Sequence, residues 1–230
     1  MFKFLLKKIS TLIEVTQIVE EVPETFTFKF AVPENIKWKL GAYDHFLASD
    51  LTGDKPFKGN LVREISIMSH PNENYIGFTT RIRSNASDFK QALGKLQAGD
   101  KIRVFFFGSH IKLPETNTPV VFISMGEGIA TFRPFIIELL DRYSETTITN
   151  INIERSGKFV YQDELNGLPA NKIKNVLVTS RNALYEGIDK TLENKENVYY
   201  VVGSKQFNKD IGSYLKKHDV DRKSIRFDKQ

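Results

Sequence analysis

The hydrophobic pattern of the chain changes near its middle, and this change does most to limit the folds open to it. In the first half, short segments alternate apolar and polar residues, and residues 25–30 carry Phe at every second position. A period of two is typical of strands with one buried face. In the second half, apolar segments alternate with amphipathic ones, which is typical of a parallel sheet with helical crossovers. The pattern therefore predicts two domains of different class.

The first domain is predicted to span residues 1–115 and to form an antiparallel β-barrel of Greek-key type with one helix. Besides residues 25–30, strands are expected at residues 65–68, 75–82 and 102–107. The helix is expected near residues 87–96, where apolar residues recur at helical spacing. Ser87 or Asn85 is expected to cap it.

The second domain is predicted to span residues 116–230 and to be an α/β domain with a parallel sheet. Its strands are expected at residues 120–124, 148–153, 175–179, 198–202 and 224–227, and its helices at residues 129–143 and 207–217. The boundary is placed in the polar linker 113–119, which a Pro residue brackets on each side.

A glycine turn follows the first strand of this second domain. Gly126 and Gly128 stand between the apolar run 120–124 and the amphipathic stretch after it. Glycine lets the backbone turn sharply and approach a ligand, and the unpaired N–H groups at the start of a helix favour a pyrophosphate. The other interpretation is a plain strand-to-helix connector, which needs glycine too.

The composition excludes several kinds of site. The chain has no Cys, so disulfides, thiolate nucleophiles, Cys-ligated zinc and iron–sulfur clusters are all excluded. Its four His residues show no paired metal-ligand spacing, and no metal site is expected. Redox chemistry would need a bound organic cofactor or a metal without thiolate ligands.

The formal net charge is +5, and eight Lys and Arg residues lie between positions 205 and 229. They form either a solvated helix face or a surface that steers an acidic partner protein. No nucleic-acid-binding motif is present, so nucleic acid is not expected as a partner. The apolar, basic N-terminus is too short and interrupted for a signal peptide or a membrane span. A cytoplasmic protein is expected.

A second motif, Arg63-Glu-Ile-Ser-Ile-Met-Ser69, lies on a predicted strand. Arg63 and Ser66 are three residues apart, so their side chains should leave the strand on opposite faces. A bulge, or a backbone contact from one of the two, would let both touch one ligand. The alternative is a surface Arg beside a half-buried strand.

These segments together resemble the ferredoxin–NADP reductase superfamily, whose members join a flavin-binding barrel to a nucleotide-binding α/β domain. Arg63–Ser69 is similar to the family's Arg-x-Tyr-Ser-Ile-Ala-Ser, and Met125–Pro134 to its Gly-Gly-x-Gly-Ile-x-Pro-Phe-Arg. Four further segments match family elements in the same order: Gly41–His45, Ser87–Asp100, Phe107–Ser109 and Tyr199–Ser204. The resemblance covers nearly the whole chain.

The resemblance implies an enzyme that transfers a hydride from NADPH or NADH to FAD and passes electrons to an acceptor protein or small molecule. It assigns Arg63 to the flavin pyrophosphate, Ser66 to the reactive edge of the flavin ring, and Ser69 and Ser87 to its ribityl or phosphate groups. The nicotinamide nucleotide is assigned to Gly126, Gly128, Ile129 and Gly203. Arg155 stands where the family reads the adenosine 2′-phosphate, which favours NADPH.

Several positions depart from the family pattern. Ile65 stands where an aromatic residue usually stacks on the flavin, and Tyr43 or Phe78 is expected to compensate. Met125, Glu127 and Val202 alter the nicotinamide elements. They favour the main alternative, a non-catalytic flavin-binding or regulatory module with a decayed nicotinamide site. A third interpretation is an interaction protein without a cofactor.

Overall fold

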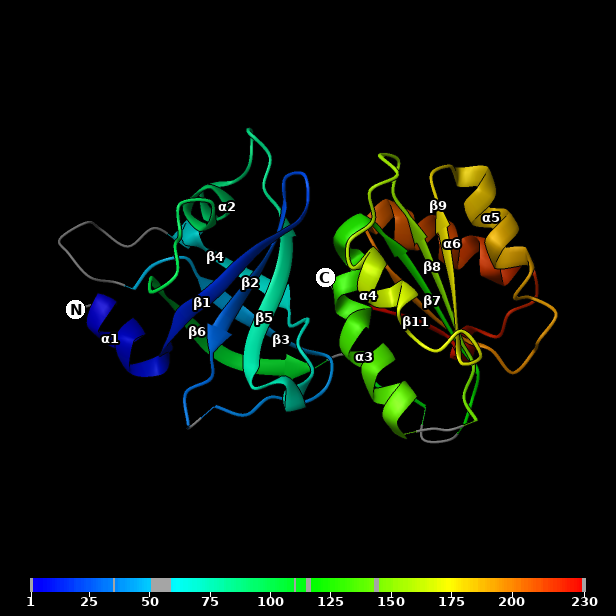
Figure 1. The fold of residues 1–230 in the computed structure, drawn as a ribbon, viewed down its shortest axis with the longest axis horizontal. Helices are drawn as coiled ribbons and strands as arrows, with labels where there is room; N and C mark the ends of the chain where they lie inside the picture. The colour runs from blue at the N-terminus through cyan, green and yellow to red at the C-terminus, as the bar shows by residue number, and fades with distance from the viewer. Residues whose placement is uncertain are drawn as a thin grey trace. The chain divides into compact units, whose positions relative to one another are not determined.

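The computed structural model describes residues 2–34, 36–50, 59–109, 111–114, 117–142 and 145–228. The chain divides into two compact units, residues 1–109 and 110–230. The predicted domain boundary, at residues 115 and 116, lies outside the described residues. Each unit is built around its own sheet (Figure 1).

The first unit is an antiparallel β domain, as its alternating pattern predicts. Its elements are α1 (Phe2–Ile9), β1 (Thr11–Val22), β2 (Thr25–Ala31), β3 (Ala42–Leu47), η1 (Gly59–Leu61), β4 (Val62–Ser66), η2 (Pro71–Glu73), β5 (Tyr75–Arg81), α2 (Asp88–Leu93) and β6 (Lys101–Ser109). The strands pair in the order β4-β3-β6-β1-β2-β5. Strands distant in sequence, such as β1 and β6, are therefore neighbours, as a Greek-key connection requires.

The sheet curls until the segment after β4 reaches β5. The backbone N–H of Met68 donates to the Gly77 carbonyl at 2.8 Å, and the N–H of Gly77 donates to the Ser69 hydroxyl at 3.0 Å. The curled sheet encloses an aromatic core in which Phe28, Phe30 and Phe78 are at most 1% exposed. The alternating Phe residues of β2 thus fill the interior.

The helix α1, which the sequence pattern did not predict, is fastened to this unit at its C-terminal end. Arg103 of β6 donates from Nη1 to the carbonyl and the hydroxyl of Ser10, at 3.2 and 3.1 Å. Its Nε donates to the Asp50 carbonyl at 3.1 Å. These bonds supply partners for backbone carbonyls that a helix end and a loop leave open.

The second unit is an α/β domain, as predicted. Its elements are β7 (Val120–Met125), η3 (Gly126–Gly128), α3 (Ile129–Arg142), β8 (Ile148–Ile153), α4 (Gln162–Asn166), β9 (Ile173–Val178), α5 (Arg181–Asp189), β10 (Val198–Val202), α6 (Lys205–Lys217), η4 (Arg222–Ser224) and β11 (Ile225–Phe227). The strands pair in parallel in the order β11-β10-β7-β8-β9. Helices α3 and α4 lie on one side of the sheet, α5 and α6 on the other (Figure 1).

Both faces of this sheet are covered, so its central strand β7 is apolar except for Ser124. Phe122 of β7 packs on Phe132 of α3, with ring centroids 4.6 Å apart. Ile123, on the opposite face, belongs to the core cluster that includes α5 and α6. Continuous apolar strands are what a parallel sheet between two helical layers demands. The helices α4 and α5 were not predicted from the pattern.

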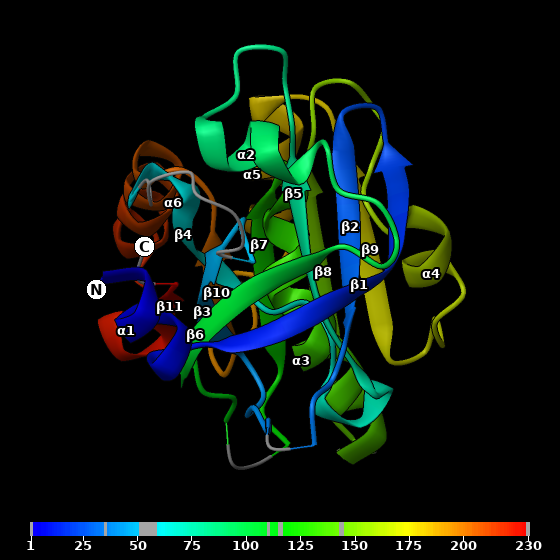
Figure 2. The same ribbon diagram turned by 90° about the vertical axis from the view of Figure 1, so that its left-hand side faces the viewer.

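Tyr200 ties β10 to β11 and to residues 111–114. Its hydroxyl donates to the Lys112 carbonyl at 2.7 Å and accepts from Nη1 of Arg226 at 2.7 Å. Burial raises the pKa of Tyr200 to about 12, although the neighbouring Arg226 acts to lower it. Figure 2 shows the same ribbon viewed from the side on which α1 lies.

Replacing Tyr200 should change how stability depends on pH. The pKa of an unfolded Tyr is about 10. The raised pKa of folded Tyr200 therefore contributes stability that is complete below about pH 10 and is lost as the pH rises toward 12. Between about pH 9 and about pH 11 the wild type should lose about 1 kcal/mol more unfolding free energy than Tyr200→Phe. Urea unfolding at both pH values measures this, and equal losses would contradict it.

Candidate functional site

The order of the parallel strands reverses between β7 and β10. From β7 the chain builds outward through β8 and β9, then returns to place β10 on the other side of β7. The loops after β7 and β10 therefore leave the sheet in opposite directions, and ligands bind at such switch points. Ser124 pairs with Val202, so Gly126 and Gly203 emerge at the same edge of the sheet.

The turn after β7 is shaped by two glycines. Gly126 is buried and has φ +57°, a left-handed conformation that glycine adopts without strain. A Cβ added to Gly128 would lie 3.0 Å from the Val202 carbonyl oxygen, too close for any other residue without movement. The turn is therefore packed directly against the end of β10.

Two helices begin at this edge. Ile129 starts α3 and is 1% exposed, and its backbone N–H donates to the Glu127 carbonyl. Ser204 caps α6 and accepts from the N–H of Phe207 at 3.2 Å. The first turns of both helices carry positive partial charge, which favours an anion.

Asn152 of β8 supports the turn through hydrogen bonds and was not identified as a site residue from the sequence. Its Nδ2 donates to the Ser124 hydroxyl at 2.7 Å and to the Gly126 carbonyl at 3.1 Å. The residue is 2% exposed, and its Oδ1 has no partner among the described residues. The signal was present: Asn150 and Asn152 lie two residues apart on β8, so one face of this largely buried strand carries both.

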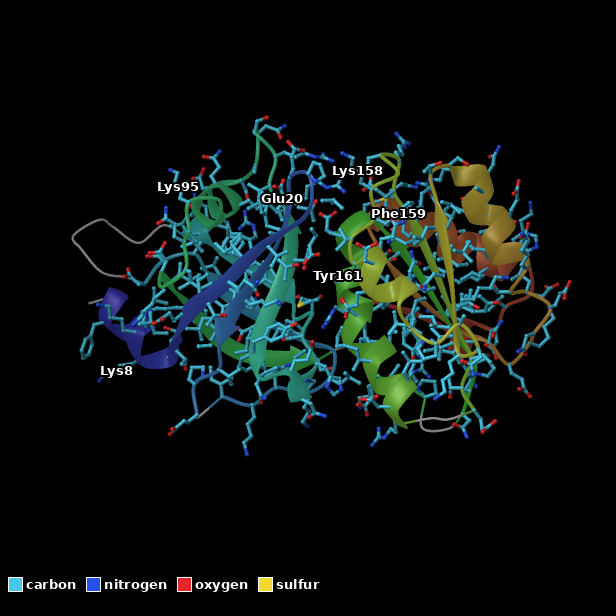
Figure 3. The ribbon with its side chains drawn as sticks, viewed as in Figure 1. Lys8, Glu20, Lys95, Lys158, Phe159 and Tyr161 are labelled. Carbon is cyan, nitrogen blue, oxygen red and sulfur yellow. The ribbon has the colours of Figure 1, made fainter. Side chains whose placement is uncertain are left out.

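Arg155 lies at the same edge, one strand along. Ile153, the last residue of β8, pairs with Met125, and Arg155 follows in an exposed turn. Within that turn the hydroxyl and N–H of Ser156 both donate to Oε1 of Glu154 at 3.1 Å. Lys158, labelled in Figure 3, is a second exposed cation of this loop, and no sequence motif marks it.

In the first unit, Arg63 lies on β4, the edge strand of the sheet. Phe46 pairs with Arg63 and Tyr43 with Ser66, without a bulge along β4. Arg63 and Ser66 thus leave the strand on opposite faces, as their spacing predicts. The exposed guanidinium of Arg63 donates to the Val62 carbonyl at 2.7 Å, so it lies along its own strand at the sheet edge.

Ser66 and Tyr43 form a direct cross-strand pair and project from the same face. Both are half-buried, and the Tyr43 ring lies across Gly108, where a Cβ would be only 2.3 Å from the ring. Phe78, the other aromatic candidate, is 0% exposed in the barrel core. Ile65 packs against that core as well. Tyr43 is therefore the candidate aromatic that a ligand can reach.

The two remaining serines differ in position. Ser69 is 1% exposed, and its hydroxyl is engaged in closing the barrel. Ser87 is exposed at the N-terminus of α2, and its side chain makes no capping hydrogen bond. The side chain of Asn60 donates to Asp88, tying η1 to α2. Because β4 follows η1 directly, Ser87 and Arg63 lie at the same end of the unit.

Two kinds of feature are absent from the part of the chain that the structure describes. No group of three or more His, Asp or Glu residues there is arranged to hold a metal ion. No described helix is both long enough and apolar enough to cross a membrane.

Comparison with solved structures identifies the fold. A ferredoxin–NADP+ reductase from Neisseria gonorrhoeae with bound FAD and NADP superposes with a TM-score of 0.77 at 18% identity, over 96% of this chain and 98% of that one. A Plasmodium falciparum ferredoxin–NADP+ reductase mutant with 2′P-AMP gives 0.79 at 18% identity, covering 96% of each. The chain therefore has the ferredoxin–NADP+ reductase fold, which confirms the fold that the motifs predicted.

Sequence comparison finds a more limited match. The chain is 30% identical over 120 residues to NADPH–cytochrome P450 reductase of Dictyostelium discoideum, which covers 46% of this chain and 18% of that protein. The chain thus spans much less than the length of this relative. No family model matches the sequence.

Removing the Asn152 side chain should loosen the glycine turn. Asn152→Ala leaves the buried Ser124 hydroxyl and the Gly126 carbonyl without this donor, which should cost about 1–3 kcal/mol of unfolding free energy. Hydrogen exchange should accelerate at the amides of residues 126–129. Asn150→Ala, on the same face of β8, is the control: it should destabilise the unit without this local acceleration. Unchanged exchange in Asn152→Ala would contradict the supporting role.

Proposed function

We propose that the protein is an FAD-dependent NAD(P)H oxidoreductase that passes electrons to an acceptor. The observation that carries the proposal is the glycine turn at the switch point of the second unit, packed on β10 where two helices begin. The first unit adds the exposed Arg63, at the same end of the unit as Ser87, whose side chain makes no capping hydrogen bond at the start of α2. The shared fold with reductases whose structures contain FAD and NADP supports the same interpretation.

In the first unit, Arg63 and Ser87 would hold the flavin pyrophosphate. A guanidinium remains charged at any physiological pH and offers a planar pair of donors that matches phosphate. Ser66 would place its hydroxyl at the reactive edge of the ring, with the Tyr43 ring beside it as the stacking surface in place of Ile65. Ser69 would contribute indirectly, by closing the barrel that positions Ser66.

In the second unit, the backbone of the glycine turn at Gly126 and Gly128 and the positive end of α3 at Ile129 would receive the nicotinamide nucleotide, with Gly203 forming the opposite wall. The absence of a Cβ at Gly128 is what brings the turn within contact distance of β10. Arg155 and Lys158 would bind the 2′-phosphate, and this pair of cations favours NADPH over NADH.

The bound cofactors supply the hydride and electron chemistry themselves. The residues of the chain bind, orient and shield. Ser66 would donate a hydrogen bond at the reacting edge, and the Tyr43 ring would fix the ring plane. No general acid–base triad is required, and positioning of this kind can account for a large part of a rate enhancement.

The acceptor is proposed to be an acidic protein. The exposed residues Lys205, Lys209, Lys216 and Lys217 on α6 form a basic surface that can steer such a partner by long-range attraction. A small-molecule acceptor would not need this surface.

A second candidate function is a flavin-binding module that no longer uses nicotinamide. Glu127 places a carboxylate within the turn, where it opposes a pyrophosphate unless it points away. Val202 lines the opposite side of the turn in place of the family's Cys. Such a module would bind flavin that neither NADPH nor NADH reduces.

Arg63→Ala tests the flavin site. The variant should weaken FAD binding about tenfold to hundredfold, because a charged hydrogen bond contributes about 1.5–3 kcal/mol. The fold should persist, since Arg63 is exposed. Visible absorbance and equilibrium dialysis measure the loss. Lys101→Ala, which removes one exposed positive charge from the same unit, should retain full flavin occupancy. Full occupancy in Arg63→Ala would refute the assignment.

Anaerobic titration with each nicotinamide tests the second site. NADPH should bleach the flavin bands of the wild type. Arg155→Ala should raise KM for NADPH about tenfold or more through loss of a charged contact, while KM for NADH stays unchanged as the internal control. A flavin that neither nucleotide reduces would favour the non-catalytic module instead. Equal effects on both nucleotides would contradict the assignment of Arg155 to the 2′-phosphate.

A further inference from the structure

We propose that α1 binds the surface of an anionic membrane and holds the protein there peripherally. The large apolar side chains that are exposed in the described part of the chain all gather on this helix and the strand that follows it. They are Phe4 at 64%, Leu5 at 53%, Ile9 at 55% and Leu12 at 36% exposure. A contiguous apolar group of this kind on an otherwise polar surface marks an interaction site.

The charge of the helix selects the partner. Lys7 and Lys8 are exposed beside the apolar side chains, and Lys8 Nζ lies 4.6 Å from the centre of the Phe4 ring. The first thirteen residues of the sequence contain no Asp or Glu. Apolar side chains flanked by Lys are what an anionic lipid surface attracts: the apolar groups insert while the ammonium groups meet lipid phosphates and carboxylates.

The helix is held in place but not covered. Leu6 is 7% exposed and packs with Leu47 of β3 and Phe105 of β6. Arg103 secures the end of the helix through Ser10. Figure 2 shows α1 at the margin of its unit, and Figure 3 labels Lys8 on it. Leu6 thus packs α1 against its unit, while Phe4, Leu5 and Ile9 are exposed.

The size of the group argues for lipid over protein. An eight-residue helix is about 12 Å long, whereas a stable protein interface takes about 800 Å² and some 20–30 residues from each partner. Four apolar side chains cover only a small part of that. Reversible lipid binding needs no more than a few inserted side chains and nearby positive charge.

Vesicle sedimentation with the full chain tests the proposal. The protein should pellet with phosphatidylserine–phosphatidylcholine vesicles, and its affinity for vesicles of phosphatidylcholine alone should be at least about tenfold lower. Added salt should weaken binding to the anionic vesicles. Leu5→Glu combined with Ile9→Glu should reduce binding about tenfold or more. Both positions are exposed, so the variant should unfold at the wild-type temperature.

The control carries the same added charge elsewhere. Gln17→Glu combined with Gln97→Glu changes two exposed polar side chains of the same unit and should bind vesicles almost as well as the wild type. Equal binding by the α1 variant and the wild type would overturn the proposal, as would equal binding to neutral and anionic vesicles. If the wild type dimerises without binding vesicles and the α1 variant does not dimerise, α1 instead binds a second copy of the chain, and the proposal is overturned. The test does not depend on flavin or nicotinamide binding.

Discussion

The contact between Gly128 and the end of β10 is the constraint on which the second unit depends. A Cβ added at Gly128 would lie 3.0 Å from the Val202 carbonyl oxygen, so any larger residue would force the turn or the end of β10 to shift. That contact holds the turn against β10 immediately before α3 begins. Asn152 completes the arrangement from below by binding the Gly126 carbonyl. A glycine turn, a helix start and a buried amide thus act as one element.

In the first unit the equivalent constraint is the closure of the barrel. The hydrogen bond from Gly77 to Ser69 and the one from Met68 to Gly77 join the segment after β4 to β5. Closure leaves β4 with one open edge, along which Arg63 lies, and sets Ser66 beside Tyr43. A serine that the family resemblance assigns to cofactor binding therefore stabilises the sheet that presents the other residues.

The helix α1 differs from both sheets because most of its described apolar side chains are exposed. Its exposed apolar residues do not fill the core, whereas Leu6 is buried in a small cluster with Leu47. An exposed apolar group is costly in water unless something covers it in use. The basic residues between them indicate that the surface covering them is anionic. The attachment of α1 through Arg103 keeps the exposed apolar side chains in one orientation.

The sequence by itself determined the fold class, the strands of both sheets that have a clear period, and the glycine turn. These follow from local rules: period two in β2, continuous apolar strands such as β7, and glycine where the chain turns into a helix. Only the tertiary structure decided which candidates meet. Phe78 lies in the core and Tyr43 at the surface because of the face of the curved sheet from which each side chain projects. Asn152 supports the turn because β8 pairs with β7, and no local pattern encodes that pairing. The elements α1, β1, β3, α4 and α5 were not predicted either. Strands β1 and β3 both pair with β6, which lies far from them in the sequence, and no local pattern encodes such a pairing.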